Sequence, residues 1–261
     1  MYIMNEKLCS SDKEREQNPI NLKANKKKKD GIELLDWYKE VPKKFLNNNH
    51  NPHFNDHLIK IPFRMIIAGN SGSGKTQTLL NLLYNMPDTW DNIWYITKNK
   101  DEPLLNFLDD KLKDDGLIID EGLESLPDLD QMDKERNNLI ILDDLVNEPL
   151  KQQRPIGDYF IRARKKNCSL CYISQSFYGV PKLIRDNITH LIIKQVSSMK
   201  NLTMICRECS LGLDKKELKK IYDDATLTKQ DFLLLDLDAE PDMRFRKNLD
   251  AVYDISSMNE K

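Results

Sequence analysis

The sequence lacks any long apolar run. No stretch of about 18 consecutive apolar residues, the length that crosses a bilayer, occurs in the chain. Residues 1–30 are polar and charged and are not built around an apolar secretory segment. We therefore expect a soluble protein that stays inside a cell.

A strong excess of either charge is also missing, because 40 basic and 42 acidic side chains leave a formal net charge of −2. A protein that coats DNA is usually far more basic. Any contact with DNA would have to use local basic patches, such as the inner surface of a ring. The basic run Lys26 to Lys29 falls in residues 1–30, where we expect a disordered tail that is a solvated arm, a weak DNA contact or a localisation signal.

Cysteine is scarce, but four of the five cysteines form two Cys-x-x-Cys pairs, Cys168 with Cys171 and Cys206 with Cys209. That spacing occurs in four-thiolate zinc sites. However, the segment from Cys168 onward has the pattern of a buried strand, in which residues three apart point to opposite faces. We therefore favour inert core thiols over a zinc site.

The most specific motif present is G-x-x-x-x-G-K-[ST], which binds nucleotide phosphates when a strand precedes it and a helix follows it. Both flanks have the required pattern, with an apolar strand at 65–68 and a helix at 76–84. Lys75 would bridge the β- and γ-phosphates of ATP, and Thr76 would ligate Mg²⁺. The motif, hereafter the phosphate loop, comprises Gly69, Asn70, Ser71, Gly72, Ser73, Gly74, Lys75 and Thr76.

A magnesium-dependent hydrolase also needs an acid at the carboxyl end of a neighbouring strand. One candidate is the pair Asp120 and Glu121, which only three apolar residues precede. The other is the pair Asp143 and Asp144, which follows four bulky apolar residues typical of a central strand. We favour the second pair, with Asp143 in the magnesium shell and Asp144 polarising the attacking water.

Two further positions fit an ATP-driven motor. Gln175 follows an apolar run, where its amide could contact the γ-phosphate or the attacking water; a simple strand cap is the alternative. Arg162 and Arg164 lie in a short amphipathic segment that ends in basic residues. Either one, presented to a neighbouring subunit's nucleotide, would act as an arginine finger, although a solvated basic helix end is also possible.

Apolar runs alternate with helical segments through most of the chain, and the runs are continuous rather than alternating. This pattern predicts a three-layer α/β P-loop NTPase fold (ASCE/RecA-like), with a mostly parallel central sheet flanked by helices. The expected strands are 65–68, 93–96, 117–119, 139–142, 170–173 and 191–193, with 231–236 as an edge strand. The expected parts are a basic tail (1–30), an N-terminal arm and linker (31–60), an ATPase core (61–196) and a C-terminal helix and strand extension packed on the core (197–261).

From about residue 51 to residue 248, the order and spacing of these motifs resemble the FtsK–HerA superfamily of ring-forming DNA pumps. Within it, the chain is most similar to the poxvirus-type genome-packaging ATPases of large DNA viruses and virophages. The residues that carry the resemblance are Ile61-Pro62-Phe63-Arg64-Met65 before the phosphate loop, Leu142-Asp143-Asp144, Arg162 to Lys165, Ser174-Gln175-Ser176-Phe177, Pro181-Lys182 and Ile184-Arg185.

The resemblance implies a homo-oligomeric ring, a hexamer or pentamer, that threads double-stranded DNA into a preformed capsid at the site of virion assembly in the host cytoplasm. Capsid proteins would be its partners. Gln175 is similar to the family's sensor glutamine. Arg164 lies where an Arg usually precedes a His, which is Lys165 here, and FtsK-type pumps generally carry Asp-Glu in place of Asp143-Asp144.

Three functions are compatible with this pattern. The first is a viral DNA-packaging translocase, and the second is a HerA-like cellular DNA motor. The third is a nucleotide-dependent switch or scaffold that hydrolyses ATP without moving DNA. Stimulation of ATP hydrolysis by DNA would separate a motor from a switch.

Overall fold

The computed structural model describes residues 35–42, 45, 49–112, 116–145, 150–196, 199–209 and 213–255. The chain divides into two compact units, Met1–Phe45 and Leu46–Lys261. The predicted basic tail, 1–30, lies outside the described residues. In the first unit, a 3-10 helix, η1 (Trp37–Glu40), begins after Asp36, whose side chain accepts a hydrogen bond from the backbone N–H of Tyr38.

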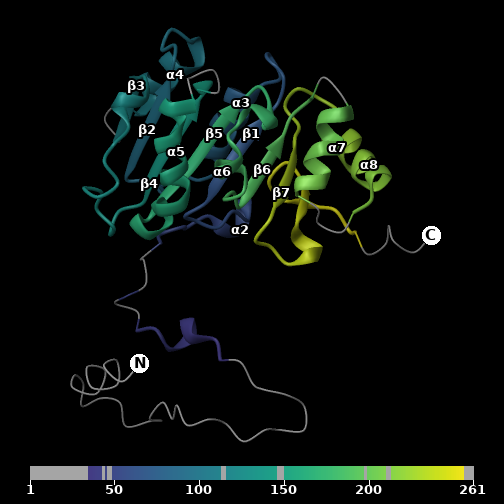
Figure 1. Ribbon diagram of the computed structural model, residues 1–261, viewed down its shortest axis with the longest axis horizontal. Coiled ribbons are helices and arrows are strands. Elements are labelled where there is room, and N and C mark those ends of the chain that lie inside the picture. The colour runs from purple at the N-terminus through teal and green to yellow at the C-terminus, as the bar shows by residue number, and fades with distance from the viewer. Residues whose placement is uncertain are drawn as a thin grey trace, which may run out of the picture. The chain divides into compact units, whose positions relative to one another are not determined.

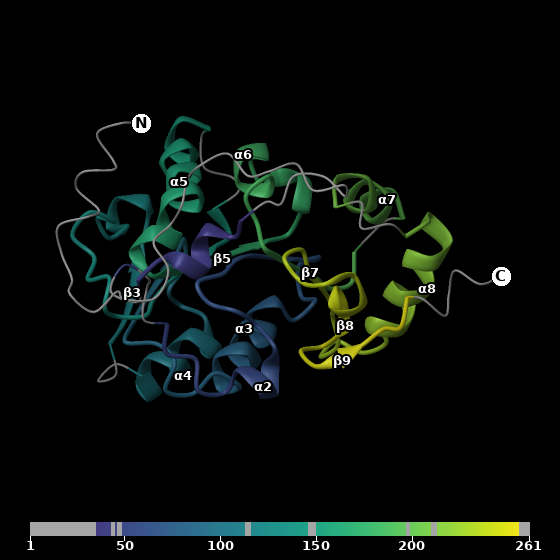
Figure 2. The ribbon, with the colours of Figure 1, turned by 90° about the horizontal axis from the view of Figure 1, so that it is seen from below.

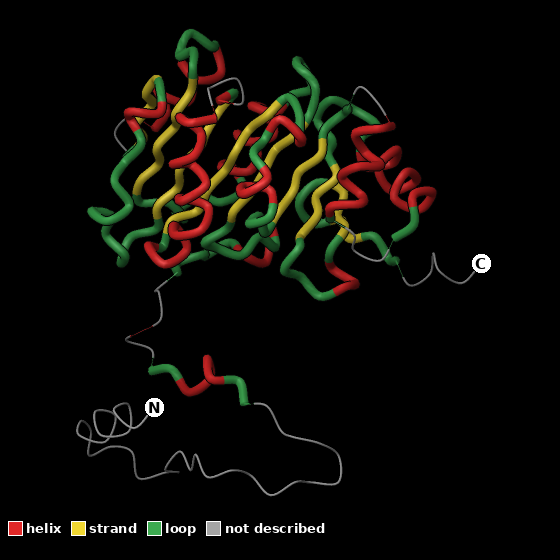
Figure 3. The backbone as a smooth tube through the Cα atoms, in the orientation of Figure 1, coloured by secondary structure: helices red, strands yellow, loops and turns green. Residues whose placement is uncertain are grey.

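In the described part of the second unit, a nine-stranded sheet has the order β3-β2-β4-β5-β1-β6-β7-β8-β9 (Figures 1 and 3). The first six strands along the chain pair in parallel, and the last three pair antiparallel. The strands are β1 (Arg64–Ala68), β2 (Asn92–Thr97), β3 (Leu117–Glu121), β4 (Asn138–Asp143), β5 (Cys168–Ser174), β6 (His190–Ile193), β7 (Leu233–Asp236), β8 (Phe245–Lys247) and β9 (Ala251–Val252). The prediction of a mostly parallel sheet flanked by helices is confirmed.

Helices cover both faces of this sheet (Figure 2). Buried side chains of α3 (Lys75–Tyr84) and α4 (Pro103–Leu112) pack on one face, and α2 (Phe54–His57) leads into the same cluster. The other face is covered by α5 (Leu150–Arg162), α6 (Lys182–Arg185), α7 (Met199–Glu208) and α8 (Lys215–Ala225). Short 3-10 turns complete the layers: η3 (Leu123–Ser125), η5 (Ala163–Lys166), η6 (Phe177–Gly179) and η7 (Pro241–Met243).

The continuous apolar runs form the middle of the sheet because every position there is buried on one face or the other. Every residue of β4 and β5 is buried. Alternate residues of β5 enter different clusters: Tyr172 packs on the side of α5, and Ile173 packs on the side of α3. The polar residues that end these strands therefore emerge together at one edge of the sheet.

The C-terminal part corrects one prediction. We expected residues 231–236 to form an edge strand, but β7 lies between β6 and β8, and two short strands continue the sheet beyond it. Arg246 on β8 is 1% exposed and donates to Asp236 Oδ2 at 2.6 Å and to the carbonyl oxygen of Leu58 at 3.1 Å. This buried guanidinium ties the last strands to the segment that follows α2.

The helices in the described part of the chain are all too short or too polar to cross a membrane.

Candidate functional site

The phosphate loop connects β1 to α3 and contains two glycines with positive φ. Gly72 has a φ of 69° and Gly74 a φ of 86°, conformations that glycine adopts without the steric cost of a side chain. Gly74 immediately precedes α3. The first N–H groups of a helix have no intrahelical partner, so the loop directs unpaired donors and the positive end of the helix dipole toward one point.

The underside of the phosphate loop is tightly packed. A Cβ atom at Gly69 would lie 2.5 Å from the Cβ of Lys194 and 2.7 Å from the Oγ of Ser73, so no side chain fits there. The Ser73 hydroxyl oxygen is buried, and the described residues give it no hydrogen-bond partner. Because buried polar atoms are nearly always paired, this hydroxyl fits a site that a polar ligand completes.

Lys75 folds back into the loop, where its Nζ donates to the carbonyl oxygens of Gly69 and Asn70, each at 3.0 Å. Burial lowers the pKa of Lys75, while the charges of Asp143 and Asp144 act in the opposite direction. The ammonium group therefore lies near the two carboxylates at the end of β4.

Asp143 ends β4 and is only 9% exposed. Its Oδ2 accepts a hydrogen bond of 2.6 Å from the hydroxyl of Tyr95 on β2. Burial raises the pKa of Asp143 to about 6, and the Tyr95 hydrogen bond and the Lys75 charge oppose that rise. The carboxylate is thus ionised at neutral pH but poorly hydrated, a state that favours a cation as its partner.

Asp144, the next residue, has a φ of 54°. Among residues with side chains, Asn and Asp adopt this left-handed region most readily, so the backbone favours Asp over Glu at this position. Gln175, just after β5, directs its Nε2 toward both carboxylate oxygens of Asp144 at 3.4 Å. The structure therefore brings Lys75, Asp143, Asp144 and Gln175 together at the carboxyl edge of β1, β4 and β5.

Sequence reasoning missed two residues at this edge, Tyr95 and Glu102. Tyr95 lies in an apolar strand, so the sequence predicts an ordinary core residue there. The signal that could have indicated a site is that a buried tyrosine hydroxyl requires a hydrogen-bond partner. Glu102 precedes α4, and its negative charge acts on the pKa values of both Lys75 and Asp143. Nothing in the local sequence marks Glu102, because the fold alone brings it near the phosphate loop.

The pair that we rejected, Asp120 and Glu121, lies on the edge strand β3, which β2, β4 and β5 separate from β1. Asp120 forms an ion pair of 2.9 Å with Lys100, and Glu121 accepts a hydrogen bond from the Lys100 backbone N–H. Both acids therefore hold the segment around Lys100, and the acids themselves lie away from the phosphate loop.

The two candidate arginine fingers lie at the opposite edge of the sheet. Arg162 ends α5 and Arg164 lies in η5, just before β5 begins, whereas Gln175 follows the end of β5. Arg162 is held within its own chain, because its Nη2 donates to both carboxylate oxygens of Asp130 at 2.7 and 2.9 Å. The Arg164 side chain is exposed. Neither arginine joins the Lys75–Asp143 cluster of its own chain.

The thiols of Cys168 and Cys171 lie in different places, as the strand pattern predicts. Cys168 packs in the cluster beneath α5, and Cys171 packs in the cluster beneath α3. Burial raises the pKa of both thiols. One metal ion cannot contact both sulfur atoms, since the sheet separates them.

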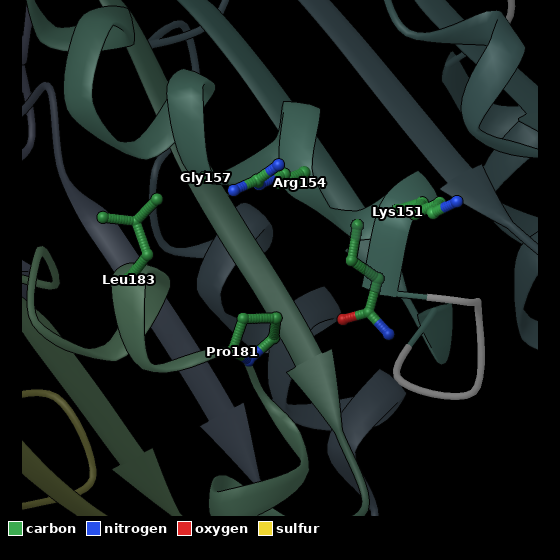
Figure 4. Close-up of a pocket in the computed structure, with 6 residues that line it drawn as sticks. Lys151, Arg154, Gly157, Pro181 and Leu183 are labelled. Atoms are coloured by element: carbon green, nitrogen blue, oxygen red, sulfur yellow. The ribbon is translucent and has the colours of Figure 1, made fainter.

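A hollow of about 330 Å³ lies between α5 and α6 (Figure 4). The helices approach closely beside it, because a Cβ at Gly157 would lie 2.6 Å from Cδ2 of Leu183. Its lining is separate from the phosphate loop and the acids of β4, and consists of Lys151, Gln153, Arg154, Gly157, Pro181 and Leu183.

The fold is that of a three-layer P-loop NTPase, and solved structures share it. The genome packaging NTPase B204 of Sulfolobus turreted icosahedral virus 2 superposes with a TM-score of 0.54 at 12% identity, over 73% of this chain and 97% of that chain. The pCW3 conjugation coupling protein TcpA superposes with a TM-score of 0.50 at 15% identity, over 75% of this chain and 62% of that chain.

Residues 51–233 match the family described as Poxvirus A32 protein, and the chain belongs to that family. The resemblance to poxvirus-type packaging ATPases is thereby confirmed. The DNA packaging protein OPG160 of Variola virus is 28% identical over 152 residues, which are 54% of this chain and 56% of that protein. OPG160 of Vaccinia virus (strain Copenhagen) matches with the same identity and coverage. The chain spans about half the length of these curated relatives.

Proposed function

We propose that this protein hydrolyses ATP at the carboxyl edge of β1, β4 and β5, and that a homo-oligomeric ring of copies uses this reaction to drive double-stranded DNA into a viral capsid. The observation that carries the proposal is the convergence of the phosphate loop with Asp143, Asp144 and Gln175. Family membership, and relatives named as DNA packaging proteins, support DNA as the substrate that is moved.

The phosphate loop accounts for nucleotide binding. The unpaired N–H groups at the start of α3 would hold the β-phosphate, and Lys75 would exchange the carbonyl oxygens of Gly69 and Asn70 for the β- and γ-phosphates. Both carbonyl contacts are neutral, so a polyphosphate is the stronger partner for the ammonium group.

Thr76 of the phosphate loop and Asp143 beside it fit Mg²⁺, which prefers hard oxygen ligands. The hydroxyl of Thr76 and the carboxylate of Asp143 are such ligands, and Asp143 is ionised at neutral pH yet poorly hydrated. Bound Mg²⁺ supplies charge neutralisation for the phosphates. Tyr95 fixes the orientation of the Asp143 carboxylate through its hydrogen bond to Oδ2.

Asp144 would act as the general base. It takes a proton from water as the water oxygen attacks the γ-phosphorus, and the bond from that phosphorus to the β–γ bridging oxygen breaks to give ADP and phosphate. Gln175, which contacts both oxygens of Asp144, would sense whether the γ-phosphate is present. Hydrolysis would thereby change a contact between β4 and β5.

The arginine finger would act between subunits. Arg162 and Arg164 lie at the far edge of the sheet from the phosphate loop of their own chain. Arg164 lies where the family carries an Arg, so we take Arg164 as the first candidate for contacting the γ-phosphate of a neighbouring copy. Arg162, which forms an ion pair with Asp130, is the second. We place the ring's action at the site of virion assembly in the host cytoplasm, with capsid proteins as docking partners.

The test is ATP hydrolysis by the purified protein with and without linear double-stranded DNA, beside the variants Lys75→Ala and Asp144→Asn. Strong stimulation by DNA that both variants abolish is the expected result. Hydrolysis that is indifferent to DNA would favour a nucleotide switch. Stimulation combined with loading onto DNA in both directions and a nuclease partner would instead favour a HerA-like motor.

A further inference from the structure

The turn between α8 and β7, residues 226–231, lies at the same edge of the sheet as the phosphate loop. β7 runs antiparallel to β6, and Leu233 pairs with Ile193, so β7 begins where β6 ends. β6 is also the parallel neighbour of β1, which leads into the phosphate loop. The backbone of the turn reaches the loop itself, since a Cβ at Gly74 would lie 3.0 Å from the carbonyl oxygen of Lys229.

A buried lysine fixes one end of this turn. Lys194 is 1% exposed, and its Nζ donates to the carbonyl oxygens of Lys229, Gln230 and Asp231 at 2.6, 3.1 and 2.9 Å. All three protons of the ammonium group can therefore be used within the turn. The stem of Lys194 runs directly beneath Gly69 of the phosphate loop, where it leaves no space for a side chain.

The next residue along the chain fixes the other end. The backbone carbonyl of Gln195 accepts a hydrogen bond from the N–H of Asn70 in the phosphate loop at 3.1 Å. Its side-chain Nε2 donates to the carbonyl oxygen of Thr226 at 3.2 Å. Lys194 and Gln195, the two residues after β6, thus hold the two ends of the turn. Both also contact the phosphate loop. Between these ties the side chain of Leu227 is 66% exposed.

The position of the catalytic acids determines which way a nucleotide would lie. Asp143, Asp144 and Gln175 follow β4 and β5, which lie on one side of β1. The γ-phosphate has to be on that side, because hydrolysis takes place there. The nucleoside at the other end of the triphosphate therefore points toward β6 and β7, where the turn is located.

We propose that the turn 226–231 forms the nucleoside end of the nucleotide site, with Leu227 as an apolar surface for the base and Lys194 as the residue that positions the turn. This inference rests on the proposed binding of ATP at the phosphate loop. It gives the C-terminal segment a role in the site, although none of the recognised motifs lies there. A ligand without a base should therefore lose the binding affinity that the turn contributes and keep the affinity that the phosphate loop contributes.

The first test is photolabelling of the full-length protein with 8-azido-ATP, followed by tryptic mapping. Label on the peptide of residues 221–229 is the expected result. A hollow of about 300 Å³ lies at the far end of the turn, where Gln230 and Asp231 line it together with residues of the segments 81–85 and 248–250. Label on residues 81–85 or 248–250 instead would place the base in this hollow, away from Leu227, and would overturn the proposal. Labelling that Lys75→Ala leaves unchanged would instead contradict nucleotide binding at the phosphate loop.

The second test separates base from phosphate by kinetics. Leu227→Ala should raise KM for ATP by about tenfold with little change in kcat, since one apolar contact is lost. Inhibition by inorganic tripolyphosphate, which has no base, should stay at the wild-type level. Leu35→Ala, which truncates another exposed leucine in the first unit, is the matched control and should leave KM unchanged.

Lys194→Met tests the positioning role, because it keeps the unbranched stem of the side chain and removes the three hydrogen bonds. It should raise KM for ATP and shift 8-azido-ATP label away from the peptide of residues 221–229. If this variant does not fold, Leu227→Ala still decides the question. An equal loss of affinity for ATP and for tripolyphosphate in Leu227→Ala would show that the turn acts on the loop rather than on the base, and would overturn the proposal.

Discussion

Asp143 combines burial with a negative charge at the carboxyl edge of the sheet. Its carboxylate is buried, and within the described part of the chain its Oδ2 accepts a hydrogen bond from the Tyr95 hydroxyl. An ionised carboxylate in such surroundings is costly, which is why burial raises its pKa to about 6. The same poor hydration makes it a better ligand for a cation.

Asp143→Asn should therefore stabilise the protein and abolish hydrolysis. The amide keeps an oxygen for Tyr95 but carries no charge, so the gain should be about 3 kcal/mol at pH 7. The folded-state pKa of about 6 lies above the ordinary value of 3.8, so wild-type stability falls as the pH rises through this window. Denaturant unfolding in magnesium-free buffer should show the advantage of the variant growing from about pH 4 to pH 6 and levelling off above that. A variant less stable than wild type at pH 7 would refute this account.

Asp144 allows its charge and its backbone conformation to be tested separately. Asn tolerates the left-handed region nearly as well as Asp does, whereas Ala at this φ costs about 1 kcal/mol. Both Asp144→Asn and Asp144→Ala should lower kcat by about 10² to 10⁴-fold, because both lack the general base. Only Asp144→Ala should also lower the free energy of unfolding. Equal unfolding midpoints for the two variants would contradict the role assigned to the positive φ.

At the scale of elements, the sequence predicts the six parallel strands well, because residues 139–142 and 170–173 are apolar at every position and so require cover on both faces. It places the phosphate loop and the β4 acids for the same reason. It fails at β7, whose apolar run is the same for an edge and an interior strand. Whether β7 is an edge or an interior strand depends on its pairing with β8, the segment around Arg246. Because β8 is short and charged, its sequence does not look like a strand.

Arg246 and Lys247 are neighbours on β8, but the Arg246 side chain is buried and the Lys247 side chain is more exposed. Substitutions of the two therefore form a matched pair. Arg246→Met leaves Asp236 buried without its closest cation and should cost about 3–5 kcal/mol. Lys247→Ala breaks a more exposed ion pair of 3.5 Å with Asp224 and should cost less than about 1 kcal/mol. Denaturant unfolding of both variants checks the difference. Similar losses would mean that β8 does not anchor the C-terminal strands as described.

At the scale of the whole molecule, the sheet holds the candidate catalytic residues and the candidate arginine fingers at opposite edges. Lys75, Asp144 and Gln175 lie at one edge, and Arg164 lies before the start of β5, a strand whose length is about 20 Å. An arginine finger on this chain would therefore have to serve the nucleotide of a neighbouring copy. The sequence could suggest the finger from its basic run, but the opposed edges are visible only in the folded sheet.

This separation predicts complementation between inactive subunits. Lys75→Ala and Arg164→Ala should each hydrolyse ATP poorly alone, because one lacks the phosphate contact and the other lacks the finger. Co-expressed with different tags and purified together, they should recover part of the DNA-stimulated activity, since some sites then combine an intact phosphate loop with an intact Arg164. Arg164→Ala mixed with the double variant Lys75→Ala/Arg164→Ala is the control and should stay inactive.

Arg162→Ala completes the comparison, because it removes only the ion pair with Asp130 and should retain most of the wild-type rate. If Arg162→Ala is inactive and is rescued by Lys75→Ala while Arg164→Ala is active, the finger is Arg162, and the Asp130 pair must open when subunits assemble. If no mixture exceeds the summed rates of its components, neither arginine acts between subunits, and hydrolysis is completed within a single chain.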